Sequence, residues 1–169
     1  MCKLADISIF TSSKSNEWET PQDLFDKLNA KFYFTLDPAA TDDNHKCAKY
    51  YTMQTDGLVQ DWSNEVVFCN PPYGKEIGKW VEKCYNEAMN HGIKIVMLIP
   101  ARTDTKWFHR YLYKKNDVDI HIEFLQGRLR FINRTFPSWR PDGNFKVSPA
   151  NFPSMLVYFN CEVNEYGLD

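Results

Sequence analysis

A few short apolar runs, each ended by turn-forming residues, constrain the fold of this chain more than any other feature. Residues 66–69, 93–99 and 154–159 are almost wholly apolar and are too short for typical helices. Such runs are typical of strands that are buried on both faces, as in parallel sheets. Proline cannot donate a hydrogen bond to a neighbouring strand, so Pro71 and Pro100 predict where two of these strands end.

Segments with helical periodicity alternate with these runs. Residues 76–91 carry apolar side chains at helical spacing and end before Gly92, which can terminate a helix. Residues 104–113 show a second amphipathic pattern. Nearer the start, Thr20 is a predicted N-cap and Pro21 suits the first helical position. The alternation of strands and helices predicts an α/β fold with a mostly parallel sheet.

Further strands are predicted at 32–36 and 118–125, and the second of these is expected to pair with 129–132 in a hairpin. The 169 residues suit a single domain. Within it, we expect residues 1–16 to form a flexible N-terminal arm and residues 133–152 to form a long loop.

Composition excludes several classes of protein. Hydrophobic residues make up 43% of the chain and charged residues 25%, which is ordinary for a globular protein. There is no 18-residue apolar span and no signal-peptide pattern, so a cytoplasmic location is expected. The five cysteines are scattered and form no CxxC pair, which argues against a disulfide framework. His45 and Cys47 are the nearest approach to a metal-binding pair, but a zinc site needs about four ligands, so we expect no metal.

Charge is unevenly distributed along the chain. Residues 94–146 contain 11 Lys and Arg against 5 Asp and Glu, whereas residues 1–93 contain 9 against 14. The basic segment also holds Trp107 and Trp139. Basic residues interleaved with aromatic ones suit nucleic acid, although a solvated surface of mixed charge would give the same counts.

The strand at 66–69 runs directly into Asn70, Pro71, Pro72 and Tyr73. One interpretation is a tight turn. The other is a site for the exocyclic amine of adenine or cytosine, whose lone pair is delocalised into the ring. The Asn70 side-chain carbonyl and the Pro71 backbone carbonyl could accept hydrogen bonds from the two N–H groups of the amine and free that lone pair. Tyr73 offers a face on which a base could stack, worth about 1–3 kcal/mol, once the base has left the duplex.

The Asn-Pro-Pro-Tyr sequence after an apolar strand resembles the catalytic motif of amino-group DNA methyltransferases, which use S-adenosylmethionine. Residues 19–21, Glu-Thr-Pro, resemble the motif that opens the first helix in one subgroup. Residues 37–40, Asp-Pro-Ala-Ala, resemble the cofactor strand of the same enzymes. From residue 16 to about residue 131, the chain is similar to the small phage-type N6-adenine methyltransferases, often called Dam. The segments that carry this similarity are NEWETPQDLFDKL, LDPAA, CNPPY, LIPARTDTKWF and FLQGRLRF.

The resemblance implies a Rossmann-like methyltransferase fold, with helices on both faces of a mostly parallel sheet and an antiparallel C-terminal hairpin. It also implies S-adenosylmethionine as the cofactor. An acidic residue is expected to bind the cofactor ribose; Asp56 is the preferred candidate and Asp61 is the alternative. The loop at 40–44 lacks the glycine that most methyltransferases carry there. The implied site residues are, for catalysis, Asn70, Pro71, Pro72 and Tyr73 and, for cofactor binding, Thr20, Pro21, Asp37, Pro38, Ala39 and Asp56.

Three arginines are candidates for binding DNA. Arg102 follows the strand at 93–99 and is expected at the same sheet edge as the site. A helix cap in that region is the alternative. Arg128 and Arg130 could contact phosphates or guanine edges, or could be exposed charges of a turn.

The resemblance implies methyl transfer to N6 of adenine in double-stranded DNA at a short target sequence, with base flipping. GATC is the natural first sequence to test. We expect a monomer or weak dimer with no membrane partner, located in the host cytoplasm if the chain is phage-encoded. Two alternatives stay open. One is the same chemistry on cytosine N4, an RNA base or a protein glutamine, and the other is an inactive DNA-binding protein on the same fold.

Overall fold

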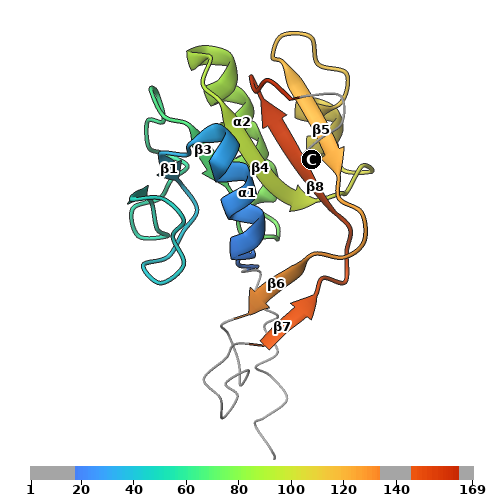
Figure 1. Cartoon of the computed structure of the whole chain (residues 1–169). Coiled ribbons are helices and arrows are strands. Elements are labelled where there is room, and N and C mark those ends of the chain that lie inside the picture. Colours follow the sequence, from blue (N-terminus) through green and yellow to red (C-terminus); the bar gives the residue numbers. More distant parts are fainter. Residues whose placement is uncertain (1–17, 134–145, 164–169) are drawn as a thin grey trace, which may run out of the picture.

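The computed structural model describes residues 18–133 and 146–163. Its centre is a six-stranded sheet with the strand order β2-β1-β3-β4-β8-β5. Strands β2, β1, β3 and β4 are parallel, and β8 runs antiparallel to both β4 and β5 (Figure 1). The strands of this sheet are β1 (Leu36–Asp37), β2 (Lys49–Tyr50), β3 (Val67–Cys69), β4 (Ile95–Pro100), β5 (Ile120–Phe124) and β8 (Ser154–Phe159).

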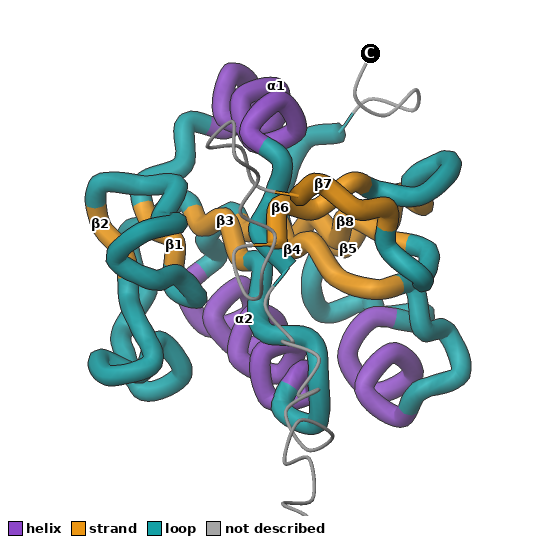
Figure 2. Tube along the Cα trace, turned by 90° about the horizontal axis from the view of Figure 1, so that it is seen from below, coloured by secondary structure: helices purple, strands orange, loops and turns teal. Residues whose placement is uncertain are grey.

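Helices cover both faces of the sheet. Helix α1 (Gln22–Phe32) lies on one face and α2 (Ile77–His91) on the other, as Figure 2 shows. This confirms the predicted α/β architecture, with helices on both faces of a mostly parallel sheet and antiparallel pairing among the C-terminal strands. Helix α2 ends as predicted, because Gly92 takes the left-handed conformation at φ 65°. None of the described helices is long and apolar enough to cross a membrane.

The core lies between the sheet and the two helices. All six residues of β4 and all six of β8 are buried, and α2 buries Trp80, Val81 and Cys84 beneath them. Burying a large apolar side chain contributes about 1.5–3 kcal/mol, so these two strands make the sheet's centre its most stable part. The same burial explains why both strands read as unbroken apolar runs.

The predicted hairpin between 118–125 and 129–132 is wrong. Strand β5 pairs with β8 instead. Strand β6 (Arg130–Asn133) pairs with β7 (Lys146–Pro149), and β7 lies inside the segment 133–152 that was predicted as a long loop. Gly127, at φ 80°, turns the chain out of the sheet after β5. The apolar strand β8 then fills the place beside β5, where both of its faces are buried.

Three local predictions also need correction. Thr20 is not an N-cap, because Pro21 occupies that position without a side-chain hydrogen bond. The predicted strand 32–36 begins only at its last residue, since α1 extends to residue 32 and Tyr33 takes the left-handed conformation. The predicted helix at 104–113 is mainly a five-residue π-helix, η2 (Phe108–Leu112). The predicted arm at 1–16 lies outside the described residues.

Candidate active site

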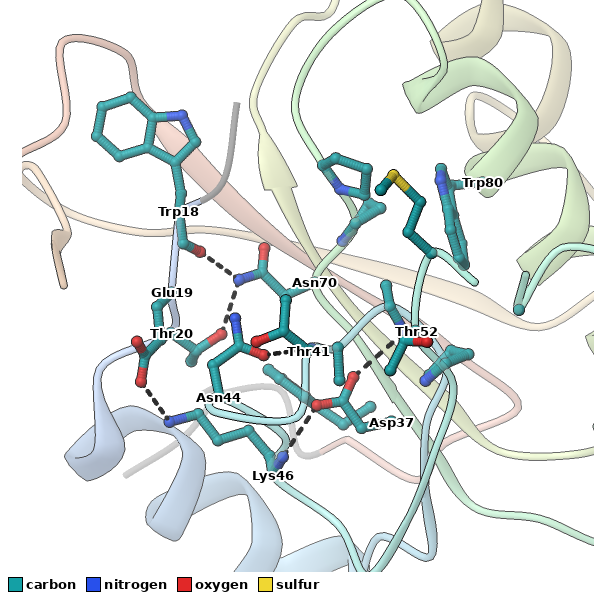
Figure 3. Close-up of a pocket in the computed structure, with 18 of the residues that line it drawn as sticks. Trp18, Glu19, Thr20, Asp37, Thr41, Asn44, Lys46, Thr52, Asn70 and Trp80 are labelled. Atoms are coloured by element: carbon teal, nitrogen blue, oxygen red, sulfur yellow. Dashed lines mark hydrogen bonds and ion pairs between the residues drawn. The ribbon is translucent and has the colours of Figure 1, made fainter. Parts of the chain in front are cut away.

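A pocket of about 400 Å³ opens at the carboxyl ends of β1 and β3 (Figure 3). Ligands of parallel α/β sheets bind at this edge. Four stretches of chain and the start of α2 wall the pocket. The stretches are 18–20 before α1, 37–46 from the end of β1, 52–58 after β2, and 68–72 at the end of β3, and the start of α2 adds Glu76 and Trp80. The pocket therefore brings together the two strand-end motifs that the sequence singled out.

The Asn70 side chain is held in one orientation. Its Nδ2 donates to the Trp18 backbone carbonyl at 2.5 Å and to the Thr20 hydroxyl oxygen at 2.9 Å (Figure 3). A flipped amide would place Oδ1 against the Trp18 carbonyl oxygen, and two acceptors cannot bond to each other. Its Oδ1 is buried and accepts no hydrogen bond from the described residues. An unsatisfied buried acceptor costs about 1–3 kcal/mol, so this oxygen is suited to receive an N–H donor from a ligand.

The two prolines after Asn70 differ in exposure. Pro71 is buried and Pro72 is exposed, and both line the pocket. Within the described part of the chain, no backbone hydrogen bond to the Pro71 carbonyl is found. The turn thus offers a second carbonyl beside the Asn70 amide.

Tyr73 is placed differently from its neighbours. It is 7% exposed and is not among the residues that line the pocket. Its hydroxyl donates to the Leu98 carbonyl at 3.1 Å, and Phe131 and Phe152 pack edge-to-face on its ring. Trp18, which does line the pocket, contacts the same two phenylalanines. The sequence did not reveal this aromatic cluster, and base stacking on Tyr73 stays a prediction.

Asp37 supplies a buried carboxyl group at the end of β1. It is 4% exposed and accepts hydrogen bonds from the backbone amides of Ala39 at 3.4 Å and Lys46 at 3.0 Å. Burial raises its pKa to about 6, against those hydrogen bonds, which lower it. The Lys46 ammonium lies 3.5 Å from a Glu19 carboxylate oxygen, and both side chains are buried (Figure 3). The floor of the pocket is therefore strongly polar.

The opposite wall is the turn at 52–58. Asp56 is exposed, takes φ 49°, and accepts a hydrogen bond from the Leu58 amide at 3.1 Å. Gly57 packs directly on the turn after β1, because a Cβ atom there would lie 2.1 Å from the Pro38 carbonyl oxygen. The close approach of two backbone segments that requires glycine is thus made between Gly57 and Pro38. Gly57 lies in the turn after β2 and not in the glycine-free loop at 40–44. Sequence reasoning missed this residue.

Comparison with known proteins agrees with this geometry. Residues 8–164 match the family described as Dam, DNA N-6-adenine-methyltransferase. The chain belongs to the Dam family. It is 37% identical to the DNA N-6-adenine-methyltransferase of Escherichia phage T1 over 129 residues, covering 69% of this chain and 53% of that protein. It is 26% identical over 149 residues to the enzyme of the same name from Haemophilus phage HP1 (strain HP1c1), covering 87% of this chain and 80% of that protein.

The chain spans about half the length of the phage T1 relative. Adenine-specific DNA methyltransferases give the Dam family its name, and the matched region includes every wall of the pocket. The pocket at the ends of β1 and β3 is accordingly the candidate active site of this Dam-family chain.

The three candidate DNA-binding arginines lie outside the pocket. Arg102 is exposed just after β4. Arg128 and Arg130 are exposed as well and line a separate groove beside α1. The structure therefore places all three on the surface of this Dam-family chain and brings Arg128 and Arg130 into one groove, which Arg102 does not line.

Among the described residues, one group of side chains could hold a metal ion: Asp61, Glu87 and His91. This group lies near the C-terminal end of α2 and does not line the pocket. Lys83 already forms an ion pair with Glu87 in that group. The His45 Nδ1 atom lies 3.0 Å from the Cys47 carbonyl oxygen, so the ring bonds to backbone rather than to the thiol.

Proposed function

We propose that this chain transfers a methyl group from S-adenosylmethionine to the N6 amine of adenine in DNA, at a short target sequence and with the adenine flipped out of the duplex. The observation that carries the proposal is the Asn70 Oδ1 atom, which is buried, oriented by two hydrogen bonds, and unpaired among the described residues. Membership of the Dam family supports DNA adenine as the acceptor.

The residues of the pocket fit S-adenosylmethionine. Its volume of about 400 Å³ lies within the usual range for small-molecule sites. Phe68, Trp80 and Leu58 supply apolar contact surface, which suits an adenine ring. Asp56 has an exposed carboxylate that can accept hydrogen bonds from ribose hydroxyls, and Asp37 can complement the positive charge on sulfur. When bound, S-adenosylmethionine supplies an electrophilic methyl group.

Thr20, Pro21, Pro38 and Ala39 complete the proposed cofactor contacts. Three of them line the pocket, and Pro21 follows directly on its wall. The Thr20 hydroxyl accepts a hydrogen bond from Asn70, so its own proton remains able to point into the pocket. Thr20 therefore links the cofactor side of the site to the catalytic side.

The catalytic role of the chain is to prepare the amine. Asn70 Oδ1 accepts one N–H of the flipped adenine, and the Pro71 carbonyl accepts the other. These two acceptors pull the nitrogen towards tetrahedral geometry and direct its lone pair at the methyl donor. Pro72 fixes the turn that presents the two carbonyls. The proton lost from the amine leaves to water, and no nucleophilic side chain is needed.

The test is a transfer assay with product identification. Duplex DNA is incubated with the chain and labelled S-adenosylmethionine, then digested, and the methylated nucleoside is identified. N6-methyladenine supports the proposal. Methylated cytosine would reassign the acceptor, and intact DNA binding without transfer would identify an inactive DNA-binding protein.

Asn70→Ala tests the role of the amide directly. It should strongly reduce transfer, while the dissociation constant for S-adenosylmethionine stays within about threefold, because every side chain proposed to contact the cofactor is kept. Loss of one preorganised hydrogen-bonding group costs about 10²–10³ in kcat in comparable sites. Asn86→Ala, which removes an exposed amide of α2, is the matched control. Near-normal transfer by Asn70→Ala would remove the basis of the proposal.

A further inference from the structure

A second recess lies beside the active-site pocket, between the first turns of α1 and the segment that leads into β6. We call it the α1–β6 groove, and its volume is about 810 Å³. Figure 1 shows β6 next to the N-terminal end of α1. The charged residues that line the groove are Asp23 and Lys27 from α1 and Arg128 and Arg130 from the β6 segment.

Counted over the described residues, the groove carries a surplus of positive charge. Lys27, Arg128 and Arg130 are exposed. Among residues 18–133 and 146–163, none of the three forms an ion pair with a carboxylate. By contrast, Lys49 and Lys83 on other surfaces each pair with a glutamate. Three cations and one carboxylate, Asp23, among the described lining residues give the groove a net positive charge.

A single stretch of chain separates the groove from the active site. Trp18 and Thr20 line the pocket, whereas Pro21 lines the groove. The same stretch is fixed to β6, since the Ile132 amide donates to the Glu19 carbonyl at 3.2 Å. A strand of DNA that lies in the groove would thus be one wall away from Asn70.

We propose that the α1–β6 groove binds the phosphate backbone of the DNA strand beside the flipped adenine, through Lys27, Arg128 and Arg130. The inference rests on the proposed function for its position relative to the adenine. Converging cations from two elements suit phosphate oxygens, which accept from both arginine forks and lysine ammonium groups. Arg130 also opens the two-stranded ribbon of β6 and β7, and a ribbon can read base edges in the major groove of DNA, so the test compares duplexes of different sequence.

The test measures how DNA binding depends on salt. The affinity of the full chain for a short duplex is determined between about 50 and about 200 mM salt, for the wild type and for a Lys27→Ala, Arg128→Ala, Arg130→Ala triple variant. Each phosphate contact contributes about 0.9 to the slope of log K against log salt. Over this fourfold range, three contacts make the wild-type affinity fall about 40-fold more than that of the triple variant.

Lys31→Ala is the matched control, because it removes the same charge from an exposed position on the same helix outside the groove. It should leave the slope unchanged, and the triple variant should weaken binding equally for duplexes of different sequence. A wild-type slope in the triple variant would overturn the proposal. So would an equal effect of Lys31→Ala, or a loss confined to particular sequences, which would indicate base reading.

Transfer to DNA by the wild type is measured separately from binding. If the wild type transfers no methyl group but the triple variant still loses salt dependence, the proposed function fails and the groove assignment stands. If the wild type transfers and the triple variant binds DNA as the wild type does, only the groove assignment fails.

Discussion

The most informative perturbation of this site is Thr20→Val. Valine keeps the shape of threonine but removes the hydroxyl oxygen, which accepts from Asn70 Nδ2 at 2.9 Å in a side chain that is only 2% exposed. The Trp18 carbonyl still holds the other N–H of the amide. Asn70 is then held by one hydrogen bond instead of two, so its Oδ1 is directed less firmly into the pocket.

The size of the effect follows from the hydrogen bond that is lost. Leaving a buried donor unsatisfied costs about 1–3 kcal/mol. If that cost falls on the arrangement needed for transfer, kcat decreases by about 5- to 150-fold. Thr20→Ser restores the hydroxyl and should return kcat to within about threefold of the wild type.

The assay separates positioning from cofactor binding. Transfer is measured with both DNA and S-adenosylmethionine saturating, and the dissociation constant for S-adenosylmethionine is measured by calorimetry. Positioning predicts a lower kcat with a smaller change in the dissociation constant. The reasoning is refuted if kcat is unchanged and only cofactor binding weakens, because Thr20 would then act on the cofactor alone.

Three further outcomes follow from the structure. Gly57→Ala should weaken S-adenosylmethionine binding and lower the free energy of unfolding by about 1–3 kcal/mol, because the new Cβ would lie 2.1 Å from the Pro38 carbonyl oxygen; unchanged affinity in calorimetry would contradict this packing. The pKa of Asp37 is raised from 3.8 to about 6, so the folded state favours the protonated form. The resulting stabilisation of about 3 kcal/mol is present below pH 3.8 and is lost as the pH rises through about 6. In urea unfolding from about pH 4 to about pH 8, the free energy of unfolding of Asp37→Asn should therefore rise relative to that of the wild type as the pH rises. A constant difference between the two proteins would argue against this assignment. Tyr73→Phe should cost about 0.5–1.5 kcal/mol in urea unfolding, since it removes the bond to the Leu98 carbonyl, and should leave kcat within about threefold; a large loss of kcat would assign chemistry to the hydroxyl.

Local sequence signals predicted the parts of the fold that local chemistry determines. The apolar run at 154–159 became β8 with the same bounds, and Pro100 ends β4 as expected. The pocket joins the ends of β1 and β3, and Asp37 and Asn70, from the two motifs that the sequence singled out, both line it. These predictions needed only strand burial, proline chemistry and the rule that ligands bind at the carboxyl ends of parallel strands.

The features that the sequence did not predict depend on contacts between distant residues. Thr20 carries a good N-cap pattern, yet its hydroxyl bonds to a side chain 50 positions away. The pairing of β6 with β7 was hidden because a turn at Gly127 is equally compatible with a hairpin. The role of Gly57 appears only when its turn is packed on Pro38.

The position of β8 in the sheet has a consequence for how the chain folds. Among the described strands, β8 is the last in sequence, yet it lies between β4 and β5 and pairs with both. During synthesis, β4 and β5 therefore leave the ribosome long before the strand that joins them. Until residue 159 has emerged, the inner edge of β4 offers unpaired backbone groups to other chains. Because this closing contact is strongly non-local, it should also slow folding, and the six-stranded sheet is completed only after β8 has been translated.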